Sequence, residues 1–157
     1  MKRISIMMML FGFALSALVY GHCEIPCGIY GDKMRIDMWL EQIETVEKSM
    51  NQIMELSKDD TKNYNQIVRW VVNKDEHADD IREIAVQYFL TQRVKPGEVS
   101  DQEYNKQLQV LHHIIVHAMK AKQTTDLEHV TKLRELVKEF YSLYFDEEMQ
   151  KHLEEHE

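Results

Sequence analysis

The residues best suited to metal chemistry lie in one short segment, His22-Cys23-Glu24-Ile25-Pro26-Cys27-Gly28-Ile29-Tyr30-Gly31, which holds both cysteines of the 157-residue chain. In a chain that began at His22, the free α-amine, the Cys23 amide nitrogen and the Cys23 sulfur could chelate one metal. Cys27 could add a second thiolate, and the His22 imidazole could bind above the resulting plane. Nickel(II) and copper(II) prefer such a planar set, whereas zinc prefers tetrahedral sites. The segment therefore predicts a site for one-electron chemistry.

The same two cysteines allow a second interpretation, a small disulfide loop. An exported protein meets an oxidising environment in which such bonds form and persist. A stapled chain would contain no free thiols and would bind no metal, so a thiol count separates the two interpretations.

Residues 1–21 are typical of a secretory signal peptide. Lys2 and Arg3 form a short positive region, and the apolar stretch over residues 4–19 carries no charge. This stretch is shorter than the ~20 residues that a membrane span needs. We therefore expect cleavage after Gly21 rather than a retained anchor. The chain would be exported to the periplasm or the cell exterior, with no stable membrane association.

The charge balance bears on the partners of the chain. Its formal charge is −8, and loss of the two basic residues of the leader would take it to −10. A nucleic-acid partner is not expected, because phosphates require a basic face. We expect three parts: a signal peptide over 1–21, a metal-binding hook over 22–31 and a helical domain over 32–157.

Apolar residues recur every three or four positions after the hook, which predicts amphipathic helices. The first apolar stripe begins after Arg35 and continues to Met54, and the second extends from Tyr64 to Phe89. The second stripe contains a polar interruption, Asn73–Asp80, that could be a charged face or a local irregularity. Two further stripes, over 104–118 and 127–144, complete a set of four helices.

The residues between the stripes support the same division. Lys95-Pro96-Gly97 can end the second helix. Ser100-Asp101-Gln102-Glu103 has the form of a capping box for the third helix, and Thr124-Thr125-Asp126 can cap the fourth. Four helices with short connections predict an all-α fold, an antiparallel four-helix bundle preceded by the hook.

The pattern His22-Cys23-x-x-Pro26-Cys27-Gly28-x-Tyr30 resembles the nickel hook of nickel-containing superoxide dismutases. The resemblance is close over these nine residues and looser over the helices. It implies a processed N-terminus before a four-helix bundle, assembly as a homohexamer and one nickel ion per subunit. It also implies an enzyme that converts superoxide to dioxygen and hydrogen peroxide by alternation between Ni(II) and Ni(III).

The resemblance also assigns roles by position. His22 would contribute its amine and its axial imidazole, Cys23 its backbone nitrogen and thiolate, and Cys27 its thiolate. Tyr30 would stand near the vacant axial side and hydrogen-bond in the substrate pocket. Pro26 would shape the turn, and Gly28 would let the backbone fold closely round the metal.

An acidic residue of the first helix should orient the axial imidazole, as partners of metal ligands commonly do. Arg35-Ile36-Asp37 resembles the family's stretch, with Asp37 where glutamate is more usual and a spacer one residue shorter. Glu41 is the alternative. A contact of Glu76-His77 with the hook is a further possibility.

His113 and His117 lie four residues apart on the third predicted helix and could share a metal with a third ligand. An ordinary helix face is the plainer interpretation, because no carboxylate accompanies them at helical spacing.

Three function classes remain open from the sequence: a nickel superoxide dismutase, an exported nickel or copper carrier without turnover, and a disulfide-stapled structural bundle.

Overall fold

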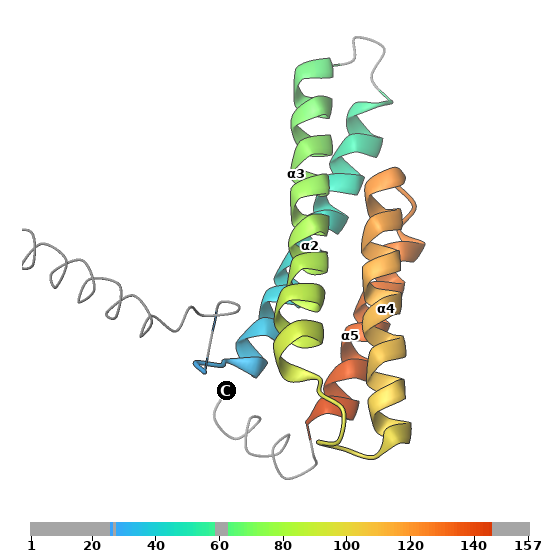
Figure 1. The fold of residues 1–157 in the computed structure, drawn as a ribbon. Coiled ribbons are helices and arrows are strands. Elements are labelled where there is room, and N and C mark those ends of the chain that lie inside the picture. Colours follow the sequence, from blue (N-terminus) through green and yellow to red (C-terminus); the bar gives the residue numbers. More distant parts are fainter. Residues whose placement is uncertain (1–25, 27, 59–62, 146–157) are drawn as a thin grey trace, which may run out of the picture. The chain divides into compact units, whose positions relative to one another are not determined.

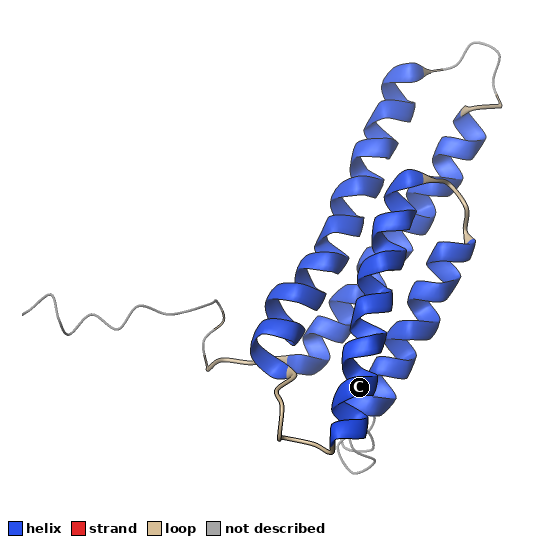
Figure 2. Ribbon diagram, turned by 45° about the vertical axis from the view of Figure 1, so that its right-hand side comes forward, coloured by secondary structure: helices blue, strands red, loops and turns tan. Residues whose placement is uncertain are grey.

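The computed structural model describes residues 26, 28–58 and 63–145. Residues 1–30 and 31–157 form two separate units, and the helical unit is described here by itself. Every regular element of the described part is a helix, and it contains no strand (Figure 2). The all-α prediction is confirmed, whereas His22, Cys23 and Cys27 of the predicted hook lie outside the described residues.

Four helical columns make up the bundle (Figure 1). They are α2 (Asp32–Leu56), α3 (Tyr64–Glu83) continued by the π-helix η1 (Ile84–Arg93), α4 (Asp101–Gln123) and α5 (Glu128–Tyr144). α2 and α4 each pack against both α3 and α5, so the columns close into a ring in which consecutive helices run in opposite directions. None of the described helices is long and apolar enough to cross a membrane.

An aromatic cluster at the centre of the bundle joins three of the columns. Trp39 of α2 is fully buried, and its ring centroid lies 4.8 Å from that of Phe89 and 5.7 Å from that of Phe140. The Trp39 indole N–H donates to the Ile81 carbonyl at 2.9 Å, so the one polar atom of the side chain is satisfied inside the core. The other buried apolar residues of α2 recur at helical spacing, Ile36, Ile43, Val46, Met50 and Ile53.

The predicted cap is confirmed at the start of α4, where Ser100 forms a complete capping box with Glu103. At the start of α5 the residue in the cap position is Leu127, whose side chain makes no cap hydrogen bond. The predicted Asp126 lies one residue earlier, and its carboxylate accepts from the Glu128 N–H at 2.9 Å. Both connections are therefore set by local side chains.

The polar interruption in the second apolar stripe is ordinary α-helix, so the alternative of a local irregularity there is wrong. Within it, Lys74 is only 3% exposed, and its Nζ donates to the carbonyls of Ala121 and Lys122. A cation at the C-terminal end of α4 satisfies orphan carbonyls and complements the helix dipole. The irregular segment of this column lies later in the chain, in η1.

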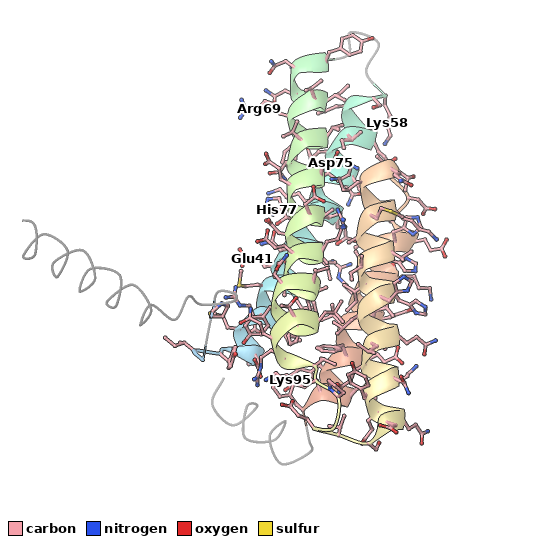
Figure 3. All side chains as sticks on the ribbon, viewed as in Figure 1. Glu41, Lys58, Arg69, Asp75, His77 and Lys95 are labelled. Atoms are coloured by element: carbon pink, nitrogen blue, oxygen red, sulfur yellow. The ribbon has the colours of Figure 1, made fainter. Side chains whose placement is uncertain are left out.

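The first half of α3 is exposed, although its apolar residues predict burial. Because Lys74 meets the last turn of α4, the residues of α3 before it extend past that end by about 15 Å. Lys58 and Arg69 lie towards this projecting end, and Lys95 lies at the opposite end of the bundle (Figure 3). The projecting segment carries four exposed apolar side chains, Tyr64, Val68, Val71 and Val72.

Candidate metal centre

Two of the predicted hook residues have backbone features that fit their roles. Pro26 lies at a bend, and Gly28 has φ +77°, a conformation that residues with a side chain rarely adopt. Among the described residues, a Cβ at Gly28 would meet no atom within 4 Å, so the backbone conformation alone already favours glycine there. Tyr30 is 40% exposed, and its place beside a substrate pocket stays a prediction.

The first turn of the bundle is held by the carboxylate of Asp32. Its Oδ1 accepts from the Tyr88 hydroxyl at 2.5 Å and from Arg93 Nε at 2.9 Å. Its Oδ2 accepts from Arg93 at 2.7 Å and from the Tyr144 hydroxyl at 2.9 Å. The Tyr88 hydroxyl in turn accepts from the Gly31 N–H at 2.9 Å. We call Asp32, Tyr88, Arg93 and Tyr144 the junction cluster, because Asp32 follows Gly31, the first residue of the helical unit.

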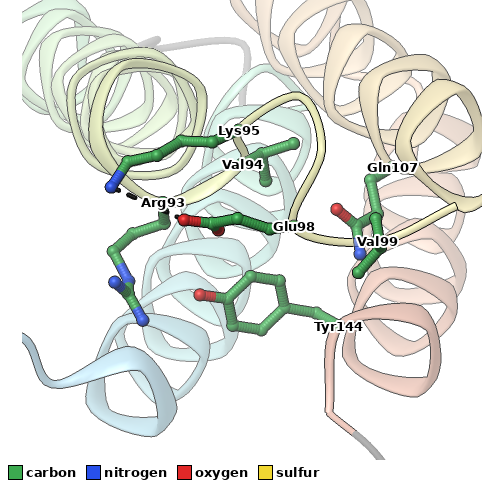
Figure 4. Close-up of a pocket in the computed structure, with 7 residues that line it drawn as sticks. All are labelled: Arg93, Val94, Lys95, Glu98, Val99, Gln107 and Tyr144. Carbon is green, nitrogen blue, oxygen red and sulfur yellow. Dashed lines mark ion pairs between the residues drawn. The ribbon is translucent and has the colours of Figure 1, made fainter. Parts of the chain in front are cut away.

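The junction cluster draws its members from three elements. Tyr88 and Arg93 belong to η1, and Tyr144 is the last residue of α5. Arg93 and Tyr144 point toward one another beside the first turn of α2 (Figure 4). They also line a pocket of about 240 Å³ whose other walls are Val94, Lys95, Glu98, Val99 and Gln107.

The charges of the junction cluster stabilise one another. Burial by itself would raise the pKa of Asp32. The hydrogen bonds from Arg93, Tyr88 and Tyr144 together outweigh this effect, so the pKa lies below its usual value. Burial and the Asp32 carboxylate raise the pKa of Tyr88 to about 12 and raise that of Tyr144 as well. Asp32 is therefore ionised and both phenols are neutral donors at neutral pH.

One cation lies close to this cluster. The Arg35 guanidinium carbon is 5.0 Å from the centre of the Tyr88 ring, within the range of a cation–π contact. Its Nε is buried and has no hydrogen-bond partner within the described part of the chain. Tyr88 is thus held by Gly31 and Asp32 at its hydroxyl and by Arg35 at its ring.

Comparison with known families decides the identity. The family model for nickel-containing superoxide dismutase matches residues 17–148, a span that includes the hook motif and all four helical columns. The chain belongs to the nickel-containing superoxide dismutase family. It is an oxidoreductase that dismutates superoxide with a nickel cofactor. Searches of curated proteins and of solved structures gave no match.

In this superoxide dismutase the two candidates for orienting His22 lie one turn apart on α2. Asp37 is half-exposed and forms an ion pair with Lys33 at 2.8 Å. Glu41 is exposed (Figure 3). His77, predicted together with Glu76 to contact the hook, contacts the side chain of Gln42, and its Nδ1 lies 4.0 Å from the Asp80 carboxylate. All three assignments stay predictions, because His22 is outside the described residues.

The sequence suggests that His113 and His117 of α4 could share a metal, but the ring next to His117 is that of His129. The rings of His117 and His129, on α4 and α5, have centroids 5.4 Å apart. Burial lowers the pKa of His117, and the nearby His129, Lys120 and His113 lower it further. Among the described residues, no three His, Cys, Asp or Glu side chains are arranged to hold a metal ion. The dismutase therefore offers His113 and His117 no third ligand in this part of the chain.

The junction cluster predicts a pH-dependent contribution to the stability of the dismutase. The folded pKa of Asp32 is lowered, so its stabilisation is complete above the unfolded value of about 3.9 and is lost as the pH falls through the folded pKa. We expect Asp32→Asn to lower the free energy of unfolding by about 1–3 kcal/mol at pH 7 and by less at pH 3. Urea unfolding at both pH values measures the difference.

Asp37→Asn is the matched control for that measurement. It removes an exposed carboxylate of the same helix that pairs only at (i, i+4) with Lys33, and such pairs contribute about 0.5 kcal/mol or less. An Asp32→Asn effect of equal size at pH 7 and pH 3 would show that the charge of Asp32 does not stabilise the fold.

Proposed function

We propose that the nickel of this dismutase is held at a processed N-terminus by His22, Cys23 and Cys27. The single observation that carries the proposal is that the family match spans the hook motif together with the bundle. The donor set fits the metal: an amine, an anionic amide and two thiolates form the strong-field planar arrangement that Ni(II) prefers. Nickel bound there supplies the one-electron couple between Ni(II) and Ni(III) that dismutation requires.

The other hook residues shape and limit access to that site. Pro26 turns the chain between the two thiolates and Gly28 turns it directly after the second, and the bend at Pro26 and the positive φ of Gly28 support these roles. With nickel held by the hook, the exposed phenol of Tyr30 would hydrogen-bond to superoxide and restrict entry to the site. Dismutation also takes up two protons for each hydrogen peroxide formed, and an exposed site can draw them from solvent.

An acidic side chain of α2 orients the His22 imidazole. Asp37 and Glu41 both lie on its exposed face within the first three turns. Asp37 is the first candidate, although its carboxylate already forms an ion pair with Lys33. Glu41 is the alternative partner for the imidazole. Either carboxylate would fix the ring through the nitrogen that does not bind the metal, the usual arrangement around ligating histidines.

Export and processing create the metal site. Residues 1–21 direct the chain to the periplasm or the cell exterior, and cleavage after Gly21 frees the His22 amine. Mass spectrometry of the exported protein is expected to give His22 as its first residue. A mature chain that starts elsewhere would contradict the assignment.

The chain assembles with copies of itself, as the homohexamers of the family do. The apolar side chains exposed on the projecting part of α3 support this proposal. Tyr64 and Val68 are 68% and 58% exposed and lie one turn apart, and a contiguous exposed apolar surface commonly marks a protein contact.

Metal selectivity is the experiment that tests the proposed function. The apo chain starting at His22 is loaded in turn with Ni(II), Cu(II) or Zn(II), and superoxide decay is followed by stopped-flow absorbance per bound metal. We expect catalysis with nickel, none with zinc and sedimentation of the nickel form as a hexamer. Tight nickel binding without turnover would instead indicate a metal carrier, and a monomeric nickel form would contradict the assembly.

A further inference from the structure

Tyr88 connects the carboxylate of the junction cluster to the backbone of the hook junction. Its hydroxyl donates to Asp32 and accepts from the Gly31 N–H. That N–H belongs to the peptide bond between Tyr30 and Gly31. Because a peptide bond is planar, this hydrogen bond at the Gly31 nitrogen ties the peptide plane at the start of the helical unit to the Tyr88 side chain.

The π-helical segment is what allows Tyr88 and Arg93 to reach one carboxylate. These residues are five positions apart, which in an α-helix would turn their side chains about 140° away from one another. In a π-helix, hydrogen bonds join residues five apart, so positions 88 and 93 share a face. η1 has this pattern, since the Val94 N–H donates to the Phe89 carbonyl at 2.8 Å and the Thr91 hydroxyl donates to the Val86 carbonyl at 2.7 Å.

The Asp32 carboxylate accepts hydrogen bonds from three side chains, more than its place at a helix N-terminus would explain. An aspartate in the first turn is already favoured by the helix dipole. Asp32 is in addition 15% exposed, and it receives a two-point guanidinium contact and two phenols from η1 and α5. Charge-assisted and paired hydrogen bonds are stronger and more directional than neutral ones. The start of α2 is therefore fixed in orientation as well as in position.

We propose that the junction cluster is a positioning device for the metal site, with Tyr88 as the residue that transmits the geometry of the bundle to the hook. The proposal rests on the proposed function, in which the hook holds nickel. Four residue steps separate Cys27 from Gly31, a reach of at most about 14 Å. Over so short a tether, loss of the hydrogen bond at the Gly31 amide is expected to disturb the metal site.

Two single-hydroxyl deletions test the positioning role. Tyr88→Phe removes the hydroxyl that links Gly31 to Asp32. Ser49→Ala is the matched control, because the Ser49 hydroxyl is buried, accepts from Asn73 at 2.9 Å and also links α2 to the next column. It lies about 25 Å along α2 from Asp32. For each nickel-loaded chain, the readouts are thermal midpoint, superoxide decay per bound nickel, the EPR spectrum of the oxidised metal and hydrogen exchange at the Gly31 amide.

Both variants are expected to lower the thermal midpoint by a few degrees. Only Tyr88→Phe should also lower the rate per nickel, by about 10- to 100-fold as expected for a misplaced reacting group, change the EPR spectrum and speed exchange at Gly31. A Tyr88→Phe chain with an unchanged spectrum and an unchanged rate per nickel would overturn the positioning role and leave the cluster a structural contact.

The spectrum and the amide exchange separate this proposal from the proposed function. If the parent chain binds nickel through the hook but does not turn over, the proposed function fails, while the Tyr88→Phe spectrum still supports or overturns the positioning role. If the parent chain binds no nickel through the hook, both are overturned, because the cluster then has no metal site to position.

Discussion

Serine in place of Cys23 or Cys27 is expected to lower superoxide dismutation by more than about 100-fold. Residues that merely orient metal ligands already cost about 10- to 100-fold when changed, and loss of a thiolate removes a ligand outright. A serine hydroxyl stays protonated at neutral pH and donates weakly, so it cannot support the higher oxidation state. Stopped-flow superoxide decay per chain measures the loss, and circular dichroism checks that the bundle is still folded.

Ile29→Ser is the control for those two variants. Ile29 lies in the same segment, is 83% exposed and has no place in the donor set, so its serine variant should keep the parent rate. The bundle core lies outside this segment, and without nickel all three variants should unfold at the same temperature as the nickel-free parent. Full activity in either cysteine variant would contradict the ligand assignment.

The bundle could be predicted because its signals are local. Apolar spacing and the Ser100–Glu103 capping box each act within one or two helical turns, and the structure confirms both. The start of the first helix does not follow from the apolar pattern, since the stripe begins after Arg35 whereas α2 begins at Asp32. The contacts that extend the helix back to Asp32 come from η1 and α5, which no local pattern reveals.

The exposed half of α3 shows a limit of periodicity. Tyr64, Val68 and Val71 have the spacing of a buried face, and spacing indicates which residues share a side of the helix. It does not indicate whether a partner helix is long enough to cover that side. Here α4 ends near Lys74, so the stripe continues past its partner.

The candidate metal centre also has one part that the sequence predicts and one part that it does not. The hook motif is contiguous, so residue types and spacing alone predict its ligands and its metal. The junction cluster joins positions 32, 88, 93 and 144, and it depends on a π-helical turn that sequence patterns do not encode. A buried charge network of this kind becomes visible only in three dimensions.

The central claim is that the α-amine of His22 is a ligand. One extra residue ahead of His22 would convert this amine to a peptide amide, a different donor that must lose a proton to bind. It would also bring additional chain close to the axial side. A large effect from so small a change is expected only if cleavage after Gly21 is the activating step.

The most direct test compares the chain that starts at His22 with a chain that carries one additional glycine before it. Each is loaded with nickel, and superoxide decay is measured per bound nickel by stopped-flow absorbance. We predict that the chain starting at His22 is fast and that the extended chain loses more than about 100-fold of that rate, the same order as loss of a ligand. Equal rates per nickel in the two chains would show that the amine is not a ligand and that the metal centre lies elsewhere in the chain.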